Sequence, residues 1–347
     1  MTDRPLGRGG LRVGPNSFGV APLANLGHEV DDDTAFAALE AAWDAGVRYF
    51  DTAPHYGLGL GERRLGAFLR TKPRDAFVLS TKVGRQLVES PDGPRLDDEG
   101  FAVTSPLRRR RDYSADGVRR SLEQSLERMG LDRIDVVFVH DPDDFAAEAL
   151  EGAFPALDAL RRESTITGYG AGMNQSEMLA RFVRETDLDV IMCAGRYTLL
   201  EQGALDELLP VAQQRGVSVV AAAVFNSGLL ARDRPPAGVN YNYQPAPAEL
   251  LDRVNTIADV CEAHGVPLPA AALQFALGHP AVATVCTGAR SAEQVRRNGD
   301  LFEVAIPVAL WADLLAAGLL RADAPVPVAS ASDPAATAAE SARKDVS

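Results

Sequence analysis

The sequence predicts an α/β protein built as one closed (β/α)₈ barrel, or TIM barrel. Eight short apolar runs recur along the chain, and each is followed by a turn and a segment of helical periodicity. The runs are nearly continuous in hydrophobicity rather than alternating, which is typical of parallel strands buried on both faces. Eight such repeats match the eight strands of a barrel. The expected strands cover residues 18–24, 47–51, 77–82, 134–140, 166–172, 190–195, 218–224 and 283–288.

An open, doubly wound sheet is the structural alternative for this alternation of strands and helices. That fold would place a glycine-rich dinucleotide-binding turn after the first strand. The corresponding segment, FGVAPLANLGHEV at residues 18–30, contains no such turn. The closed barrel is therefore preferred, as a single domain over residues 1–321.

Helix ends between the expected strands carry their usual residues. The segment from residue 31 opens with three acids, which suit a helix N-terminus, and closes at Gly46. Ser114 is a good N-cap for a helix that ends at Gly130. A third segment ends at Gly216. At Gly46 and Gly216 an apolar run follows directly, which indicates that a helix stops and a strand starts.

Four segments stand outside the repeat. Residues 6–19 indicate a short β-hairpin that covers the floor of the barrel. Residues 84–113 and 231–248 are rich in proline, glycine and polar residues and follow the third and seventh strands. They are expected as extended loops at the C-terminal mouth, where barrel enzymes build their sites. Residues 322–347 are rich in Ala, Pro and Ser and are expected to be a disordered tail.

Composition limits the classes of function. The chain has 347 residues and a net charge of −13, which argues against nucleic acid or an anionic membrane as the main partner. Its three cysteines show no paired spacing, so neither a disulfide framework nor a zinc motif is expected. No signal peptide or membrane segment is indicated, so a cytoplasmic location is expected. The basic run from Arg108 to Arg111 is interpreted as a solvated loop face, with an anion contact as the alternative.

Ionisable residues end three of the expected strands: Asp51, Lys82 and His140. Because the carboxyl ends of all strands in a parallel barrel meet at one mouth, these side chains are expected to converge. Tyr56 follows Asp51 by one short, glycine-broken loop. Each residue alone has a structural explanation, as a turn cap, a solvated strand end, a turn residue or a packing ring. Their joint occurrence at one mouth indicates an active site.

Such a set of residues suits proton transfer to or from a carbonyl or hydroxyl group. A free phenol titrates near pH ~10, and a neighbouring ammonium favours the phenolate. Lys82 is expected to lower the pKa of Tyr56 in this way, while Asp51 pairs with Lys82. His140 would hydrogen-bond the substrate oxygen and orient it. The arrangement requires no serine or cysteine nucleophile and no metal.

Four stretches of the sequence carry a resemblance to a known family. They are GVRYFDTAPHYGLGLGERRLG, STKVG, DRIDVVFVHDPD and GARSAEQVRRN. With them, the chain resembles the aldo-keto reductase superfamily over roughly residues 5–320. The resemblance implies an oxidoreductase that uses NADPH or NADH without a Rossmann fold. It also implies that Tyr56 is the proton donor or acceptor and that Asp51, Lys82 and His140 complete a catalytic tetrad.

Within the superfamily, the chain is most similar to the branch of D-threo-aldose 1-dehydrogenase, L-fucose and L-galactose dehydrogenases and pyridoxal 4-dehydrogenase. DTAPHYGLGLGE, RDYSADGVRRSLEQSL, GAGMNQSEML, AGRYTLLEQGALDELLP and VFNSGLLA carry this likeness. It implies oxidation of an aldose of the L-fucose, L-galactose or D-arabinose type at C1 to the lactone. The alternatives are a carbonyl reductase or a pyridoxal dehydrogenase of the same fold. A non-catalytic nicotinamide-binding regulatory subunit is a less favoured alternative than these enzymes.

The resemblance also implies where the cofactor binds. A turn after the last strand precedes a helix that starts near Ser291, and backbone N–H groups at such a helix end suit a phosphate. A helix after the seventh strand would hold the pyrophosphate. The implied cofactor-binding residues are Asn174, Phe225, Asn226, Ser227, Leu229, Gly288, Ala289, Arg290, Gln294 and Asn298.

The sequence departs from the common family pattern at several of these positions. Gly172 and Met173 stand where a Ser-Asn pair usually holds the carboxamide, and Asn174 follows. Ala194 and Ala222 replace a glutamine and the tyrosine that commonly stacks on nicotinamide. Gln294 replaces an arginine often used for the 2′-phosphate. These changes favour NAD slightly over NADP.

Residues at the mouth are candidates for contact with a small sugar or carbonyl substrate. They are His55, Arg196 and Tyr197, with Trp43 as a further candidate. The rival function is a metal-dependent barrel hydrolase using Asp51, His55, His140 and Asp141. With only five histidines and no His-x-His after the first strand, the sequence disfavours it. Formation of a homo-oligomer is left open.

Overall fold

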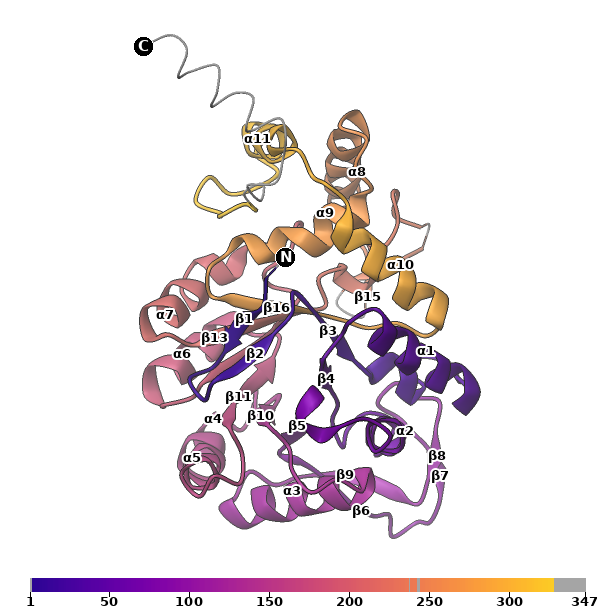
Figure 1. Ribbon diagram of the computed structural model, residues 1–347, viewed down its shortest axis with the longest axis vertical. Coiled ribbons are helices and arrows are strands. Elements are labelled where there is room, and N and C mark those ends of the chain that lie inside the picture. The colour runs from indigo at the N-terminus through magenta and orange to yellow at the C-terminus, as the bar shows by residue number, and fades with distance from the viewer. Residues whose placement is uncertain (1, 237, 242–243, 328–347) are drawn as a thin grey trace.

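Eight parallel strands close into a barrel, and helices surround it (Figure 1). The computed structural model describes residues 2–236, 238–241 and 244–327. Around the barrel the strands follow the order β10-β11-β12-β13-β16-β3-β4-β5, and β5 pairs with β10 to complete the circle. The strands are β3 (Asn16–Gly19), β4 (Tyr49–Asp51), β5 (Val78–Val83), β10 (Val136–His140), β11 (Gly168–Met173), β12 (Val190–Ala194), β13 (Ser218–Ala222) and β16 (Val282–Thr287).

Each predicted apolar run overlaps one of these strands, so the predicted barrel is confirmed. The first run is the least accurate, because β3 ends at Gly19 and Ala21–Ala24 form a 3₁₀ turn, η1. Pro22 has no backbone N–H to donate and suits the start of such a turn. The backbone N–H of Val20 still bonds to the carbonyl of Asp51, which holds the turn against β4.

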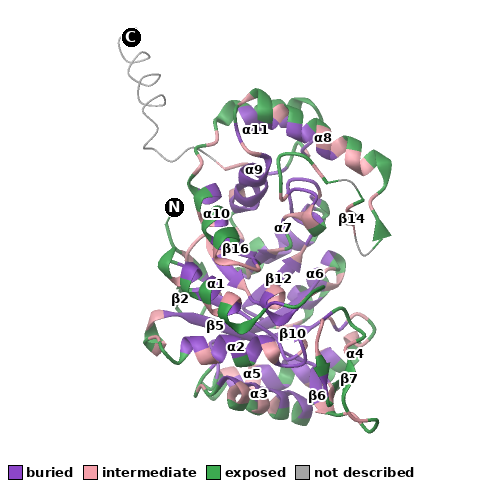
Figure 2. Ribbon diagram, turned by 90° about the vertical axis from the view of Figure 1, so that its right-hand side faces the viewer, coloured by how far each residue is buried: buried purple, intermediate pink, exposed green. Residues whose placement is uncertain are grey.

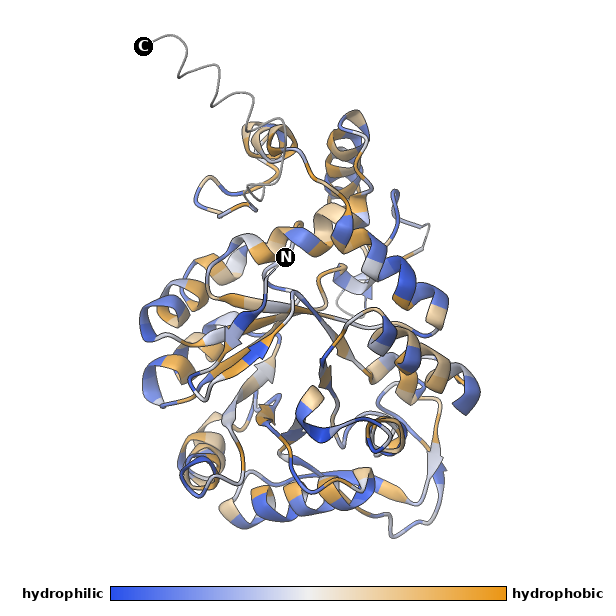
Figure 3. Ribbon diagram, in the orientation of Figure 1, coloured by the Kyte–Doolittle hydropathy of each residue, from blue (hydrophilic) through white to orange (hydrophobic). Residues whose placement is uncertain are grey.

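Helices cover the outside of the barrel and pack on it through their apolar faces (Figure 3). Most of them connect successive strands, including α8 and α9 between β13 and β16, and α8 packs against the C-terminal helix α11 at one end of the molecule (Figures 1 and 2). The longer helices are α1 (Asp32–Asp44), α2 (Leu60–Leu69), α3 (Ala115–Met129), α5 (Phe154–Arg162), α6 (Ser176–Glu185), α7 (Leu208–Arg215), α8 (Ala248–Ala263), α9 (Leu268–Phe275), α10 (Ala292–Glu303) and α11 (Val308–Ala316).

The predicted helix ends are confirmed. Asp31 caps α1 by accepting from the N–H of Thr34, and Ser114 caps α3 by accepting from Gly117. The chain leaves α3 at Gly130 and α7 at Gly216, both with positive φ. These caps satisfy backbone groups that the ends of a helix leave unpaired.

A hairpin forms the floor of the barrel, as predicted, but it covers residues 4–13 rather than 6–19, because residues 16–19 belong to β3. β1 (Arg4–Leu6) pairs antiparallel with β2 (Leu11–Val13). Leu6 and Val13 join an inner cluster with residues near the starts of the barrel strands, including Val78 and Val136. Arg4 donates to the carbonyls of Leu277 and Val282. The hairpin therefore closes the end of the barrel opposite to the mouth.

The insertion after β5 is more ordered than the loop that the sequence predicts. β6 (Arg85–Glu89) pairs antiparallel with β9 (Leu107–Arg111), and β7 (Arg95–Leu96) pairs with β8 (Thr104–Ser105). The basic run lies in β9, where Arg108, Arg110 and Arg111 are exposed and the side chain of Arg109 is nearly buried. Three of the four arginines thus match the predicted solvated face. A second short pair, β14 (Asn240–Tyr241) with β15 (Gln244–Pro245), lies in the insertion after β13.

Burial is concentrated on the strands and on the inner faces of the helices (Figure 2). Trp43 belongs to this packed layer, because its ring stacks on Phe50 and meets Phe68 edge-on. It does not lie at the mouth, so the expectation that it contacts substrate is wrong. In the expected tail, Ala324 is buried and residues 325–327 pass close to Gly278. Residues 328–347 lie outside the described part of the chain.

Candidate active site

Three neighbouring barrel strands carry the predicted ionisable residues to the mouth. Asp51 ends β4, Lys82 lies near the end of β5, and His140 ends β10. In the register, Asp51 is opposite Ser80, and Lys82 is opposite Phe138. Parallel pairing therefore places these side chains side by side.

Tyr56 reaches the same place through a tight turn between β4 and α2. Its backbone N–H bonds to the carbonyl of Ala53, and Gly57 and Gly59 follow with positive φ. A Cβ on Gly57 would lie 2.4 Å from the carbonyl oxygen of Ala24. Glycine is therefore required at position 57, and the turn is fixed against η1.

Asp51 and Lys82 form a buried ion pair. Lys82 Nζ lies 2.6 Å from Asp51 Oδ2 and also donates to the carbonyl of Thr52 at 3.0 Å. The other carboxylate oxygen of Asp51 accepts from Ser80 Oγ at 2.6 Å, and Ser80 in turn accepts from Tyr49. These bonds hold the ammonium in one place, 4.8 Å from the centre of the Tyr56 ring.

The pKa values of this group differ in part from the expectation. Burial raises the pKa of Tyr56 to about 12, although the charge of Lys82 and its hydrogen bond act in the opposite direction. Burial acts to lower the pKa of Lys82, but Asp51 and Tyr56 together raise it above its usual value. Lys82 therefore stays charged. The expected net decrease in the phenol pKa is wrong, because removal from water outweighs the ammonium.

His140 faces Tyr56 from β10. The two ring centres are 5.8 Å apart, and the rings are nearly perpendicular at 88°. Burial, followed by the charge of Lys82, lowers the pKa of His140 well below its usual value, so the imidazole is neutral at pH 7. Its Nδ1 is buried and has no hydrogen-bond partner among the described residues. A neutral imidazole beside the phenol can donate to or accept from a substrate oxygen.

His55 is the one predicted substrate residue that joins this group. Its ring centre lies 5.9 Å from that of Tyr56 and 5.4 Å from that of His140. Burial and the nearby Arg85 lower the pKa of His55 to about 2. The ring is therefore neutral and able to accept a hydrogen bond.

Three further residues, Arg85, Asp141 and Phe101, lie at this mouth. Of these, only Asp141 has an expected role, as a ligand in the disfavoured metal-dependent hydrolase. Arg85 lies against the ring nitrogens of His55 at 3.3 and 3.4 Å and donates to Asp141 Oδ2 at 2.5 Å. Phe101, from the insertion, meets the His55 ring edge-on with centres 5.2 Å apart. Arg85 and Asp141 follow the strands of Lys82 and His140 directly, which is the signal that could have found them. Phe101 has no such signal, because its place depends on the folding of the insertion.

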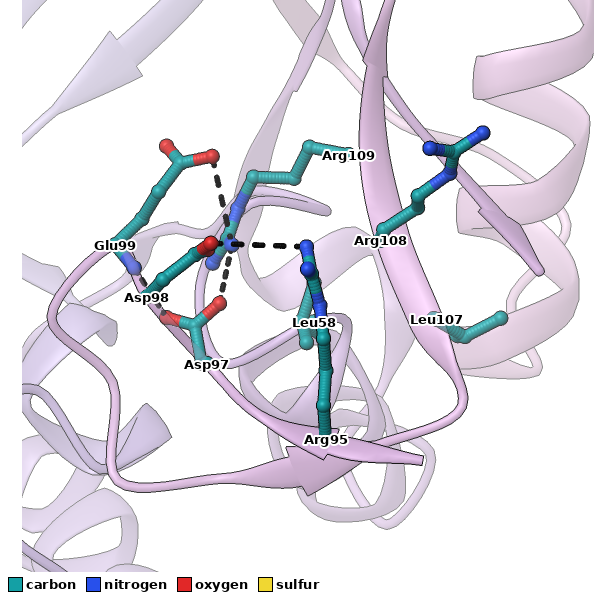
Figure 4. Close-up of a pocket in the computed structure, with 8 residues that line it drawn as sticks. All are labelled: Leu58, Arg95, Asp97, Asp98, Glu99, Leu107, Arg108 and Arg109. Carbon is teal, nitrogen blue, oxygen red and sulfur yellow. Dashed lines mark hydrogen bonds and ion pairs between the residues drawn. The ribbon is translucent and has the colours of Figure 1, made fainter. Parts of the chain in front are cut away.

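Residues of the insertion after β5 hold the backbone of His55 in place. Figure 4 shows Arg109 directed toward Asp97 and Glu99, beside a cavity of about 150 Å³. Arg109 also donates to the backbone carbonyl of His55 at 2.9 Å. Because the charges lining this cavity pair with one another, we interpret it as structural support for the mouth.

The implied cofactor residues follow three other strands of the barrel, β11, β13 and β16. Asn174 follows β11, residues 225–229 follow β13, and Gly288 begins the turn between β16 and α10. Ser291 caps α10 by accepting from the N–H of Gln294. β13 and β16 lie across the barrel from β5 and β10, whereas β11 is the direct neighbour of β10.

The segment after β13 is not the expected helix but a 3₁₀ turn, η5 (Asn226–Gly228). Ala223, Asn226, Ser227 and Gly228 all have positive φ. Successive residues of this kind can form a concave backbone surface that suits an anion, which fits a dinucleotide phosphate. Ser227 is exposed there, whereas the side chain of Leu229 is fully buried. Leu229 can therefore contribute only through its backbone.

The turn before α10 also fits a nucleotide. Gly288 is exposed, and a Cβ there would lie 2.8 Å from the Pro22 ring, so a bare backbone is required. The backbone N–H of Arg290 bonds to Gln294 Oε1 at 2.9 Å, and the Arg290 guanidinium donates to the carbonyl of Leu26. Ala289 and Asn298 are buried beneath this turn.

Arg196 and Tyr197 are not brought to the four central residues. Tyr197 is buried, and its ring packs on Phe275 of α9 with centres 5.2 Å apart. The expectation that Tyr197 contacts substrate therefore finds no support in its packing position. Arg196 lies at the end of β12, where its Nη1 is 3.5 Å from Glu201 Oε2.

None of the described helices has the length and apolar character needed to cross a bilayer. Among the described residues, no three His, Cys, Asp or Glu side chains are grouped as metal ligands.

Comparison with known proteins gives consistent similarities. A protein-family profile, described as the Aldo/keto reductase family, matches residues 17–316. The chain is 49% identical to D-threo-aldose 1-dehydrogenase of a Pseudomonas species, over 92% of this chain and 98% of that protein. It is 43% identical to pyridoxal 4-dehydrogenase of Microbacterium luteolum, over 91% and 97%.

Two further relatives extend the comparison. The chain is 31% identical to L-galactose dehydrogenase of Arabidopsis thaliana, over 85% of this chain and 86% of that protein. Among solved structures, the holo form of an aldo-keto reductase from Bacillus halodurans superposes with a TM-score of 0.74 at 27% identity. That superposition covers 93% of this chain and 97% of the other.

Proposed function

Since the chain belongs to the aldo/keto reductase family of nicotinamide-dependent oxidoreductases, we propose that it oxidises the C1 hydroxyl of a cyclic aldose to the lactone. The observation that carries this proposal is the similarity to D-threo-aldose 1-dehydrogenase, which extends over nearly the whole of both chains. The polar groups around Tyr56 support it, because a sugar presents several hydroxyl groups to such a mouth.

Tyr56 acts as the general base in this direction. Its oxygen takes the proton of the C1 hydroxyl, and Lys82 stabilises the phenolate that this requires. Asp51 keeps Lys82 in place and charged. His140, neutral beside the phenol, donates to the same substrate oxygen and orients it. In the reverse direction, Tyr56 would protonate a carbonyl oxygen.

The cofactor is proposed to bind across the rim formed by the ends of β11, β13 and β16. The turn at residues 223–228 and the N-terminus of α10 would hold its phosphates, and Asn174 would lie near the nicotinamide. When bound, the oxidised nicotinamide would accept the hydride from C1. We propose NAD slightly before NADP, because Gln294 bonds to the backbone of Arg290 and carries no charge for a 2′-phosphate.

Pyridoxal is the second candidate substrate, because the similarity to pyridoxal 4-dehydrogenase also covers most of both chains. Pyridoxal forms a cyclic hemiacetal, so the same proton transfer by Tyr56 would apply. It lacks the row of ring hydroxyls that an aldose carries.

A substrate panel tests the proposal. L-fucose, L-galactose, D-arabinose and pyridoxal are each supplied with NAD⁺ and with NADP⁺, and absorbance of the reduced nicotinamide is followed. We expect turnover of at least one aldose, with kcat/KM above that for pyridoxal. Turnover of pyridoxal alone would replace the substrate assignment, and turnover of none would contradict the function.

A further inference from the structure

Arg85 and Asp141 form an ion pair beside the predicted tetrad residues. β5 and β10 are neighbours in the barrel, and each supplies one predicted tetrad residue, Lys82 or His140. Arg85 follows Lys82 by three residues and Asp141 follows His140 by one. The two side chains meet at 2.5 Å, and Arg85 also contacts His55, whose ring centre lies 5.9 Å from that of Tyr56 and 5.4 Å from that of His140.

This ion pair retains unused hydrogen-bonding groups. Among the described residues, Arg85 Nε is buried without a partner. Asp141 uses only Oδ2, which accepts from Arg85 and lies 3.6 Å from His140 Nε2. Its Oδ1 accepts no hydrogen bond within the described chain, and its side chain is 27% exposed. Asp141 Oδ1 is therefore left as an acceptor, and Arg85 Nε is a buried donor without a partner among the described residues.

The backbone conformation of Asp141 helps to place this pair. Its φ is +39°, in the left-handed region that favours glycine or asparagine. Its N–H bonds to the carbonyl of Gly172, which fixes the conformation. Aspartate is, with Asn and His, one of the non-glycine residues enriched at positive φ, so Asp141 can adopt this conformation. The conformation fixes where the side chain leaves the end of β10.

A sugar hydroxyl is the group that such a pair recognises well. It donates to a carboxylate and accepts from a guanidinium at the same time, and both bonds are charge-assisted. The neighbouring His55 is neutral, and Glu99 lies 3.2 Å from Arg85 Nη1, so further acceptors continue along the rim. Hydrogen bonds to charged groups contribute about 1.5–3 kcal/mol each, or about 10- to 100-fold in affinity.

We propose that Arg85 and Asp141 bind the ring hydroxyl next to the reacting carbon. The enzyme then selects cyclic hemiacetals that carry a hydroxyl at C2 over those that do not. This inference rests on the proposed function and names the substrate feature that the same site reads.

The test compares an aldose that the protein oxidises with the matching 2-deoxy aldose. Wild-type kcat/KM is expected to be at least about tenfold higher for the aldose. In Asp141→Asn, which keeps the shape and suits the left-handed backbone, kcat/KM for the aldose should fall at least about tenfold, mainly through KM. The value for the 2-deoxy aldose should change less than about threefold. Dividing variant by wild-type values removes the intrinsic reactivity of each substrate.

Asp98→Asn is the matched control. Asp98 is an exposed acid in the insertion after β5 that also contains Arg85, and it lies 3.6 Å from Arg95. This control should leave kcat/KM unchanged for both the aldose and the 2-deoxy aldose. Arg85→Met repeats the test from the other partner, and fluorescence titration of reduced cofactor shows that each variant is folded. An equal loss of kcat/KM on the aldose and the 2-deoxy aldose would overturn the proposed role of Arg85 and Asp141 but not the proposed function. The absence of a wild-type preference for the aldose would do the same. Absence of wild-type turnover of any aldose would overturn the proposed function and this inference together.

Discussion

Lys82 Nζ lies 2.6 Å from Asp51 Oδ2, and the two side chains are 2% and 3% exposed. A buried pair of this kind has lost its hydration, and its attraction only offsets that cost. Removing one partner leaves an uncompensated charge in the same apolar surroundings. The pair therefore links the chemistry of the site to the stability of the barrel.

Asp51→Asn should reduce the free energy of unfolding by about 3–5 kcal/mol, because the Lys82 ammonium remains buried without its counter-ion. Urea unfolding at neutral pH measures this value. Glu185→Gln is the control, since it weakens an exposed ion pair with Arg181 that contributes at most about 1 kcal/mol. A loss in Asp51→Asn no larger than in the control would contradict the account of a buried charge.

Tyr56→Phe should reduce kcat at least about 100-fold, because it removes only the oxygen that accepts the proton. The ring and its contact with His140 are kept, so the fold should be unaffected. Titration of reduced cofactor by fluorescence should give a Kd within about twofold of wild type, since the proposed cofactor groups lie on the other strands. Turnover near the wild-type rate would remove Tyr56 from the proton transfer.

Oxidation should become faster as the pH rises. The base is the phenolate, and the pKa of Tyr56 is about 12. Well below that pKa, the fraction of phenolate increases about tenfold for each pH unit. A positively charged nicotinamide stabilises the phenolate, so a plateau is expected below pH 12. The measurement is kcat/KM for the aldose against pH at saturating oxidised cofactor, and a rate that falls with rising pH would contradict it.

The protein should lose stability in mild acid because His55 stays neutral when folded. Its pKa is about 2 in the folded state and 6.5 as a free side chain. Below 6.5 the unfolded chain therefore binds a proton that the folded chain does not, and stability falls as the pH falls. At pH ~5.5 this histidine alone accounts for about 1.4 kcal/mol relative to neutral pH. His140 acts in the same direction.

Urea unfolding at about pH 7.5 and pH 5.5 checks this linkage. His55→Asn should show a loss between the two pH values that is smaller than in wild type by about 1.4 kcal/mol. His28→Asn, at an exposed position, should behave like wild type. An unchanged loss in His55→Asn would show that the imidazole is not responsible.

The strand ends were predictable because the signal is local. Apolar runs stop at Asp51 and His140, and parallel pairing then brings the two residues together. The position of Phe101 was not predictable, because it depends on how a long insertion folds back onto the mouth. The burial of Tyr197 against Phe275 was missed for a similar reason, since an aromatic residue after a strand suits either a mouth or a packed layer.

The pKa of Tyr56 shows a second limit of sequence reasoning. The sequence predicts which charge lies near the phenol, and Lys82 is indeed next to it. It does not give the burial of the ring, and burial determines the sign of the net shift. A chemical neighbour can be inferred from spacing, whereas the balance of opposing effects requires the packed structure.

Two glycines of β11 should differ strongly in how much stability they lose when replaced by alanine. A Cβ on Gly170 would lie 1.5 Å from the carbonyl oxygen of Val190 on β12, so Gly170→Ala must separate two barrel strands. A Cβ on Gly172 would lie 3.5 Å from Met192 Cβ and 3.7 Å from Lys82 Cε, which are ordinary contacts. Gly170→Ala should lose more than about 4 kcal/mol of stability or fail to fold, and Gly172→Ala less than about 1 kcal/mol. Soluble yield and thermal unfolding compare the pair, and equal behaviour would contradict the close approach of β11 to β12.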